Sequence, residues 1–183
     1  MSTASHPDTA AMLDLAAGHD TALNGIMDRW REKVTAFLYR MTGNNDAAAD
    51  LAQETFVRIY QARHRYVAGN PFSTWLFAIA ANLARNHLRW RARHPEVALP
   101  LEDTRPDPAD DPAAAAATRE KLAAVRNAIA ALPVDLREVL VLSFYHGMSH
   151  AEAAVALGCS SKAVERRLHR ARERLRQSLV GEN

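Results

Sequence analysis

The sequence predicts an all-α protein made of two small helical domains joined by a flexible linker. Apolar residues recur at helical spacing along most of the 183 residues, and no segment shows the strict apolar–polar alternation of a half-buried strand. Only 7 glycines are present, and several of them follow helix-like stretches, where a helix can end. An acidic segment rich in proline and alanine lies between two basic parts of the chain, which predicts a domain boundary there.

Charge and proline content indicate the domain limits. Residues 1–94 and 119–183 each contain an excess of Lys and Arg, whereas residues 95–118 hold 6 acidic residues, 1 basic residue and most of the prolines. A helix cannot cross such a segment, so an extended linker is expected that permits both compact and open domain arrangements. The predicted divisions are an N-terminal tail with a first short helix, a first domain, the linker and a second domain: 1–19, 20–94, 95–118 and 119–183.

Composition excludes several classes of function. The chain is 48% apolar, enough for packed cores, but no apolar run reaches membrane-spanning length and no secretory signal is recognised. A cytoplasmic protein without membrane insertion is therefore expected. Its single cysteine, Cys159, leaves no internal disulfide and no zinc cluster, and its 8 histidines are scattered. No nucleophile–base pair or phosphate-binding glycine loop is found, so the sequence predicts no cofactor, no metal and no enzymatic activity.

Four helices are predicted in the first domain and its tail. They cover residues 9–17, 20–42, 45–64 and 72–91, with Asp20 capping the second and Asn45 or Asp46 capping the third. The fourth helix has an apolar stripe and, beside it, a polar stripe: Asn82, Arg85, Asn86, Arg89 and Arg93. That second stripe fits either a solvated face or a surface that follows a nucleic-acid strand.

The second domain contains the clearest pattern, a helix-turn-helix motif. Helices are predicted over 113–131 and 135–146, before the motif itself. Ser149 and Glu152 have capping-box spacing, so a helix begins at Ser149; Gly158 allows the turn, and a last helix follows over 161–178. This last helix has an apolar back and a strongly basic front. Basic helix faces also occur on ordinary bundles, but this combination favours entry into a DNA major groove.

Three stretches of the chain resemble bacterial sigma factors. They are NDAAADLAQETF from Asn45, FSTWLFAIAANLARNHLRWRAR from Phe72, and the segment from Leu132 to Leu175. The first two resemble sigma region 2 and the third resembles region 4. The short length and bare linker are similar to the extracytoplasmic-function (ECF) group, sigma-70 group 4. The resemblance implies a transcription initiation factor that binds core RNA polymerase, recognises two promoter elements and assists melting.

The resemblance also implies roles for individual residues. Those matching the polymerase-binding positions, which contact the clamp helices of the largest subunit, are Asp50, Gln53 and Glu54. Those matching the minus-10 surface are Tyr66, Asn70, Asn82, Arg85, Asn86 and Arg89. Those matching the minus-35 helix are Ser161, Lys162, Glu165, Arg166, Arg167, His169 and Arg170. Tyr66 fits a base-stacking role or a core role, and Arg167 fits a phosphate or the polymerase flap. The linker acids fit either mimicry of RNA phosphates in the polymerase or simple solubility.

Two positions differ from the family pattern, and two alternative functions remain. Ala49 stands where a Glu is usual, and Glu165 stands where a basic residue is common. An anti-sigma factor is an expected partner. The main alternative is a conventional dimeric helix-turn-helix regulator, which would leave residues 45–93 unexplained and would read a palindrome. A DNA-binding enzyme would need a catalytic constellation within residues 1–94, and none is found.

Overall fold

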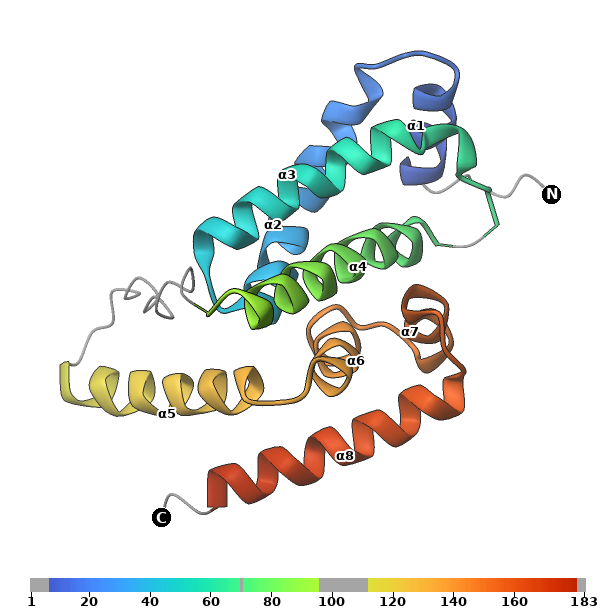
Figure 1. Ribbon diagram of the computed structural model, residues 1–183. Coiled ribbons are helices and arrows are strands. Elements are labelled where there is room, and N and C mark those ends of the chain that lie inside the picture. The colour runs from blue at the N-terminus through green and yellow to red at the C-terminus, as the bar shows by residue number, and fades with distance from the viewer. Residues whose placement is uncertain (1–6, 70, 96–111, 181–183) are drawn as a thin grey trace.

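The computed structural model describes residues 7–69, 71–95 and 112–180, and their regular elements are helices (Figure 1). The N-terminal half contains α1 (Pro7–Ala16), α2 (Ala22–Thr42), α3 (Asn45–Gln61), a 3-10 turn (Arg63–Arg65) and α4 (Phe72–Arg93). The C-terminal half contains α5 (Pro112–Ala130), α6 (Val134–Tyr145), α7 (His150–Leu157) and α8 (Ser161–Val180). The helical prediction is confirmed for these residues. Most of the predicted linker, and Asn70, lie outside them.

Two predicted helix caps were wrong. The Asn44 carboxamide, rather than that of Asn45 or the carboxylate of Asp46, accepts the Ala47 amide at 2.7 Å and begins α3. The Thr42 hydroxyl accepts the Asn44 amide at 3.3 Å across the turn at Gly43. This contact favours Asn44 as the capping residue of α3.

Asp20 does not cap α2. The residue flanking that helix is Thr21, which makes no side-chain cap bond. The Asp20 carboxylate instead accepts the Tyr60 hydroxyl at 3.2 Å, so a contact with α3 replaces the local cap.

The end of α3 also differs from the prediction. The helix ends at Gln61, not near His64, and the chain tightens into the 3-10 turn. Arg63 stabilises this turn, because its guanidinium donates to the Tyr60 carbonyl at 2.9 Å and lies over the Tyr60 ring. The turn brings Tyr66 back towards α1, where its hydroxyl lies 3.2 Å from that of Thr9.

One apolar core runs through both halves of the molecule. Buried Phe37 of α2 and Phe77 of α4 belong to the same cluster as Leu142 of α6 and Ala153 of α7. A smaller cluster, which includes Leu136 of α6 and Ala171 of α8, joins the C-terminal helices. The arrangement is therefore compact, one of the two kinds that the linker was expected to permit, and α6 lies between the N-terminal half and α8 (Figure 1).

Candidate nucleic-acid interface

The helix-turn-helix motif is built by local hydrogen bonds. Glu152 Oε2 accepts from the Ser149 amide at 2.9 Å and from its hydroxyl at 2.7 Å, while Ser149 Oγ accepts the Glu152 amide at 3.2 Å. These bonds from Ser149 hold the pKa of the Glu152 carboxyl below its usual value. Gly158 ends α7 with a φ of 65°, and Ser160 Oγ accepts the Ala163 amide at the start of α8. The predicted capping box and turn are confirmed.

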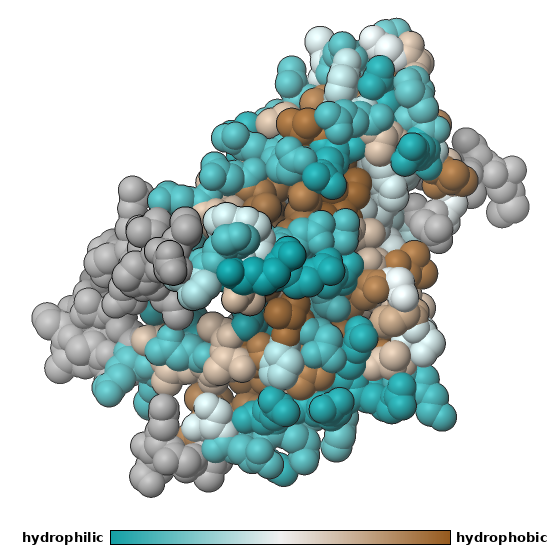
Figure 2. Space-filling view, in the orientation of Figure 1, coloured by the Kyte–Doolittle hydropathy of each residue, from teal (hydrophilic) through white to brown (hydrophobic). Residues whose placement is uncertain are grey.

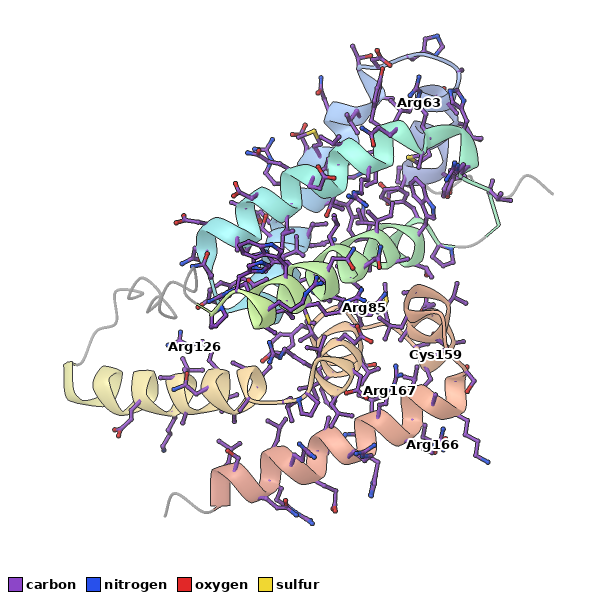
Figure 3. All side chains as sticks on the ribbon, viewed as in Figure 1. Arg63, Arg85, Arg126, Cys159, Arg166 and Arg167 are labelled. Carbon is purple, nitrogen blue, oxygen red and sulfur yellow. The ribbon has the colours of Figure 1, made fainter. Side chains whose placement is uncertain are left out.

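The front of α8 is open to solvent. Val164, Leu168 and Ala171 are buried on its inner side. Six of the seven residues predicted for the minus-35 helix are exposed on the other side: Ser161, Lys162, Glu165, Arg166, His169 and Arg170. Figure 2 shows a largely hydrophilic surface where α8 forms the lower rim of the molecule, and Figure 3 shows Arg166 on that helix. The exposed lysine and arginines of this face can attract a polyanion from solvent.

Arg167, the seventh residue, is placed differently. It is half-buried and lies 3.7 Å from carboxylate oxygens of both Asp135 and Glu138 on α6. Its position beside Leu168 turns its side chain towards the inside of the domain. The resemblance grouped Arg167 with the minus-35 helix, for a phosphate or the polymerase flap, and sequence spacing did not indicate its contact with α6.

The polar stripe of α4 is partly covered. Asn82, Asn86 and Arg89 are exposed, and Arg89 donates to the Asn86 carboxamide at 2.6 Å. Arg85, in contrast, donates to Glu138 Oε2 of α6 at 2.8 Å. The stripe therefore contacts the C-terminal half through Arg85 and faces solvent through its neighbours.

A cavity of about 640 Å³ lies between this stripe and the helix-turn-helix. Asn82 and Arg85 line one side, residues 155–158 at the end of α7 and in the turn after it line the other, and Arg58 and Arg65 add positive charge. The surface predicted to hold the minus-10 strand thus faces α7 in this arrangement.

Tyr66 belongs to an aromatic cluster. Its ring lies 6.1 Å from that of Phe72 and 5.5 Å from that of Trp75, both centroid to centroid, and its side chain is half-buried. This placement matches the core role, the second of the two that the sequence allowed.

The residues predicted to bind polymerase share an outer face of α3. Asp50 and Gln53 are exposed, and Glu54 is 43% exposed in its side chain and accepts from Arg58 at 2.7 Å. The opposite side of the helix packs into the core through Ala52 and Phe56. This face is therefore free to bind a partner without disturbing the fold.

Three charged or titratable residues of the interface between the halves were not singled out from sequence. Buried Arg137 donates to the Met41 carbonyl of α2 at 2.5 Å and to the carbonyls of Ala130 and Leu132. Glu138 is buried beside it. Two charged residues in succession within an apolar stretch, LREVLVL, were the available signal, since buried charges require partners.

The third of these residues, His146, follows α6 and packs against the N-terminal half. Its ring lies 5.8 Å from that of Phe37 and 4.5 Å from that of Phe77. Burial, with Arg40 and Lys33 nearby, lowers the pKa of His146 to about 4. The imidazole is therefore neutral at ordinary pH and packs against these two aromatic rings.

The described residues contain no group of three or more His, Cys, Asp or Glu side chains placed to hold a metal ion. Within the same part of the chain, none of the helices combines the length and apolar character needed to cross a membrane.

Comparisons with known protein families match each half of the chain separately. Sigma-70 region 2 matches residues 26–94, and Sigma-70 region 4 matches residues 122–175. RNA polymerase sigma factor CarQ of Myxococcus xanthus is 38% identical over 168 residues, which cover 90% of this chain and 92% of CarQ. The chain is an ECF sigma factor. It is accordingly a transcription initiation factor and not an enzyme.

Other relatives match this sigma factor over a similar share of its length. The ECF sigma factor SigW of Bacillus subtilis is 32% identical, with 88% of this chain and 91% of SigW covered. Among solved structures, CnrH in complex with the cytosolic domain of CnrY superposes with a TM-score of 0.75 at 29% identity, covering 97% of this chain and 100% of the other. The sigma factor RpoE of Bartonella quintana, in complex with the anti-sigma factor NepR, has a TM-score of 0.72 at 24% identity, covers 87% of this chain and 98% of RpoE, and supports the fold alone.

Proposed function

We propose that this sigma factor binds core RNA polymerase in the cytoplasm and directs it to promoters through two DNA elements. The observation that carries the proposal is the unobstructed cationic front of α8 on a rigidly capped helix-turn-helix. Arg166 and Arg170 are exposed there, and an arginine can read a guanine through two hydrogen bonds. The polar stripe of α4, with Asn82, Asn86 and Arg89, is the proposed surface for the minus-10 strand, where base stacking and amide hydrogen bonds offset the cost of unpairing.

The proposed polymerase contact is the outer face of α3, made by Asp50, Gln53 and Glu54. Small acidic and amide groups that are exposed on a well-packed helix can pair with a basic coiled coil. An anti-sigma factor is the expected regulatory partner, and the solved structure of CnrH in complex with the cytosolic domain of CnrY supports this expectation.

Charge reversal on α3 tests the polymerase contact. The Asp50→Lys/Glu54→Lys protein should fold normally, because the lost Glu54–Arg58 ion pair and the new like-charge contacts at the exposed surface cost only about 0.3–0.5 kcal/mol each. It should fail to join core polymerase in a pull-down and fail to start transcription in vitro. Asp28→Lys/Glu32→Lys is the matched control, since these exposed acids have the same spacing on α2. A folded α3 variant that transcribes as well as this control would overturn the assignment.

A further inference from the structure

Glu138 is a buried carboxylate held by arginines from both halves of the sigma factor. Its side chain is 3% exposed, and it pairs with Arg85 of α4 at 2.8 Å and with Arg167 of α8 at 3.7 Å. Figure 3 shows Arg85 on the α4 side and Arg167 on the α8 side of α6. Burial raises the pKa of the Glu138 carboxyl, and the two arginines act in the opposite direction. The carboxylate therefore needs both cations where it lies.

The Arg85–Glu138 and Arg167–Glu138 pairs depend differently on how the two halves are arranged. Arg167 and Glu138 belong to the same half, so their contact is compatible with any arrangement of the two halves. Arg85 belongs to the other half and reaches Glu138 only when α4 lies against α6. In that arrangement the Arg85 side chain is 29% exposed, whereas Asn82, Asn86 and Arg89 of the same stripe remain in solvent.

The closed arrangement also places the end of α7 opposite part of the stripe. Asn82 and Arg85 face residues 155–158, at the end of α7 and in the turn after it, across the 640 Å³ cavity. A DNA strand following α4 would compete with α7 for this space and, through its phosphates, with Glu138 for Arg85. Arg58 and Arg65 on the same cavity add positive charge that favours the strand once α7 has moved.

We propose that Glu138 is an autoinhibitory latch, which takes Arg85 out of the promoter-binding stripe of α4 and holds the sigma factor closed until a competing anion or partner releases it. The masking part of this proposal rests on the proposed role of α4 in DNA binding; the latch itself does not. The closed arrangement depends on this contact because Glu138 stays buried there, and a buried carboxylate that loses one of its cations is costly.

Distance measurements test the latch without DNA. Spin labels at Ala49→Cys on α3 and Gln177→Cys on α8, in a Cys159→Ser background, report the separation of the halves from exposed positions. The wild-type protein should show mainly one short distance. Arg85→Gln and Glu138→Gln should each raise the ratio of open to closed molecules by about tenfold, the change that corresponds to roughly 1.4 kcal/mol.

Two matched controls separate the latch from general loosening. Asp135→Asn removes the other acidic partner of Arg167 and leaves the Arg85–Glu138 pair intact, so it should not open the protein. Arg89→Gln removes a neighbouring cation on the α4 stripe that has no contact with Glu138, and it should also stay closed. If Glu138→Gln loses helical structure, the Arg85→Gln variant alone tests the latch, because the Arg85 side chain lies at the surface of α4. A folded Arg85→Gln protein with the wild-type distance distribution would overturn the latch.

DNA binding tests the masking separately. The probe is a short labelled single-stranded DNA of mixed sequence. Glu138→Gln retains Arg85 and should bind this probe up to about tenfold more tightly, since apparent affinity scales with the open fraction. Asp135→Asn should bind as the wild type does. If Glu138→Gln opens the protein without tighter binding, masking is overturned and α4 loses its support as the minus-10 surface, while the latch stands.

Discussion

The basic surfaces of α4 and α8 have similar sequence patterns but different surroundings. Both helices carry an apolar stripe and a cationic one. The cations at the front of α8 face solvent, while Arg85 of α4 pairs with a buried carboxylate from the other half of the chain. One proposed DNA-binding surface is therefore open to solvent, and the other is partly covered by the protein itself. Whether a basic stripe is free depends on what packs against it, and helical spacing does not contain that information.

The largest expected effect comes from replacing Arg137, which links the two halves of the molecule at their interface. Arg137→Met leaves three main-chain carbonyls without their donor, those of Met41, Ala130 and Leu132. We expect a loss of about 3 kcal/mol in the free energy of unfolding, measured by denaturant titration. Arg170→Met on the exposed front of α8 is the control and should change stability by less than about 0.5 kcal/mol. Equal losses would mean that the interface contributes little to the fold.

Acidification should weaken the same interface through His146. The pKa of His146 lies near 4 in the folded protein against an ordinary 6.5, so the unfolded chain takes up the proton first as pH falls. The contribution of neutral His146 to the free energy of unfolding is fully present above pH 6.5. It falls by about 2 kcal/mol between pH 6.5 and 4, once partial solvent screening is allowed for. The charges facing the ring, Arg40 and Lys33, are both cationic and oppose protonation.

The control for this pH dependence is His146→Leu, measured by denaturant titration across the same range. Subtracting its curve from that of the wild type removes the contribution of the carboxylates. If the difference is flat between pH 6.5 and 4, the imidazole is not buried as the structure has it.

Arginine replacements compare the two reading surfaces directly. Arg166→Ala on α8 should cost about 1–3 kcal/mol on a minus-35 duplex and relax preference at one base pair. Arg89→Ala on α4 should weaken binding evenly across sequences and flatten the salt dependence by about one counterion. Fluorescence anisotropy on cognate and scrambled duplexes at several salt concentrations distinguishes these results. Equal loss for Arg166→Ala on both duplexes would contradict base reading.

The smallest expected effect concerns α7, which covers one side of the α4 cavity. Ser149→Ala removes the capping box, and we expect about 1 kcal/mol of destabilisation by thermal unfolding. Ser160→Ala, the corresponding change before α8, is a useful companion because its hydroxyl also accepts a main-chain amide. If only Ser149→Ala opens the protein in the distance measurement, α7 is the cover over the stripe.

Local chemistry accounts for what the sequence predicted well. The helix-turn-helix follows from neighbours in the chain: a serine and a glutamate three residues apart, a glycine at the turn, and leucines at helical spacing. The caps of α2 and α3 were misplaced where several polar residues stood side by side, and only a contact such as Asn44 with Thr42 chose among them.

By itself, the sequence determined the helical class, the basic front of α8, the acidic outer face of α3 and the family resemblance. The first three depend on residues within a few turns of one another, and the resemblance depends on three such local stretches. The tertiary structure decided the rest: that one core joins the two halves, that His146 packs between aromatic rings, and that Glu138 holds arginines from α4 and α8. These features join residues far apart in the chain, and the free energy of a buried charge depends on which partners folding brings to it.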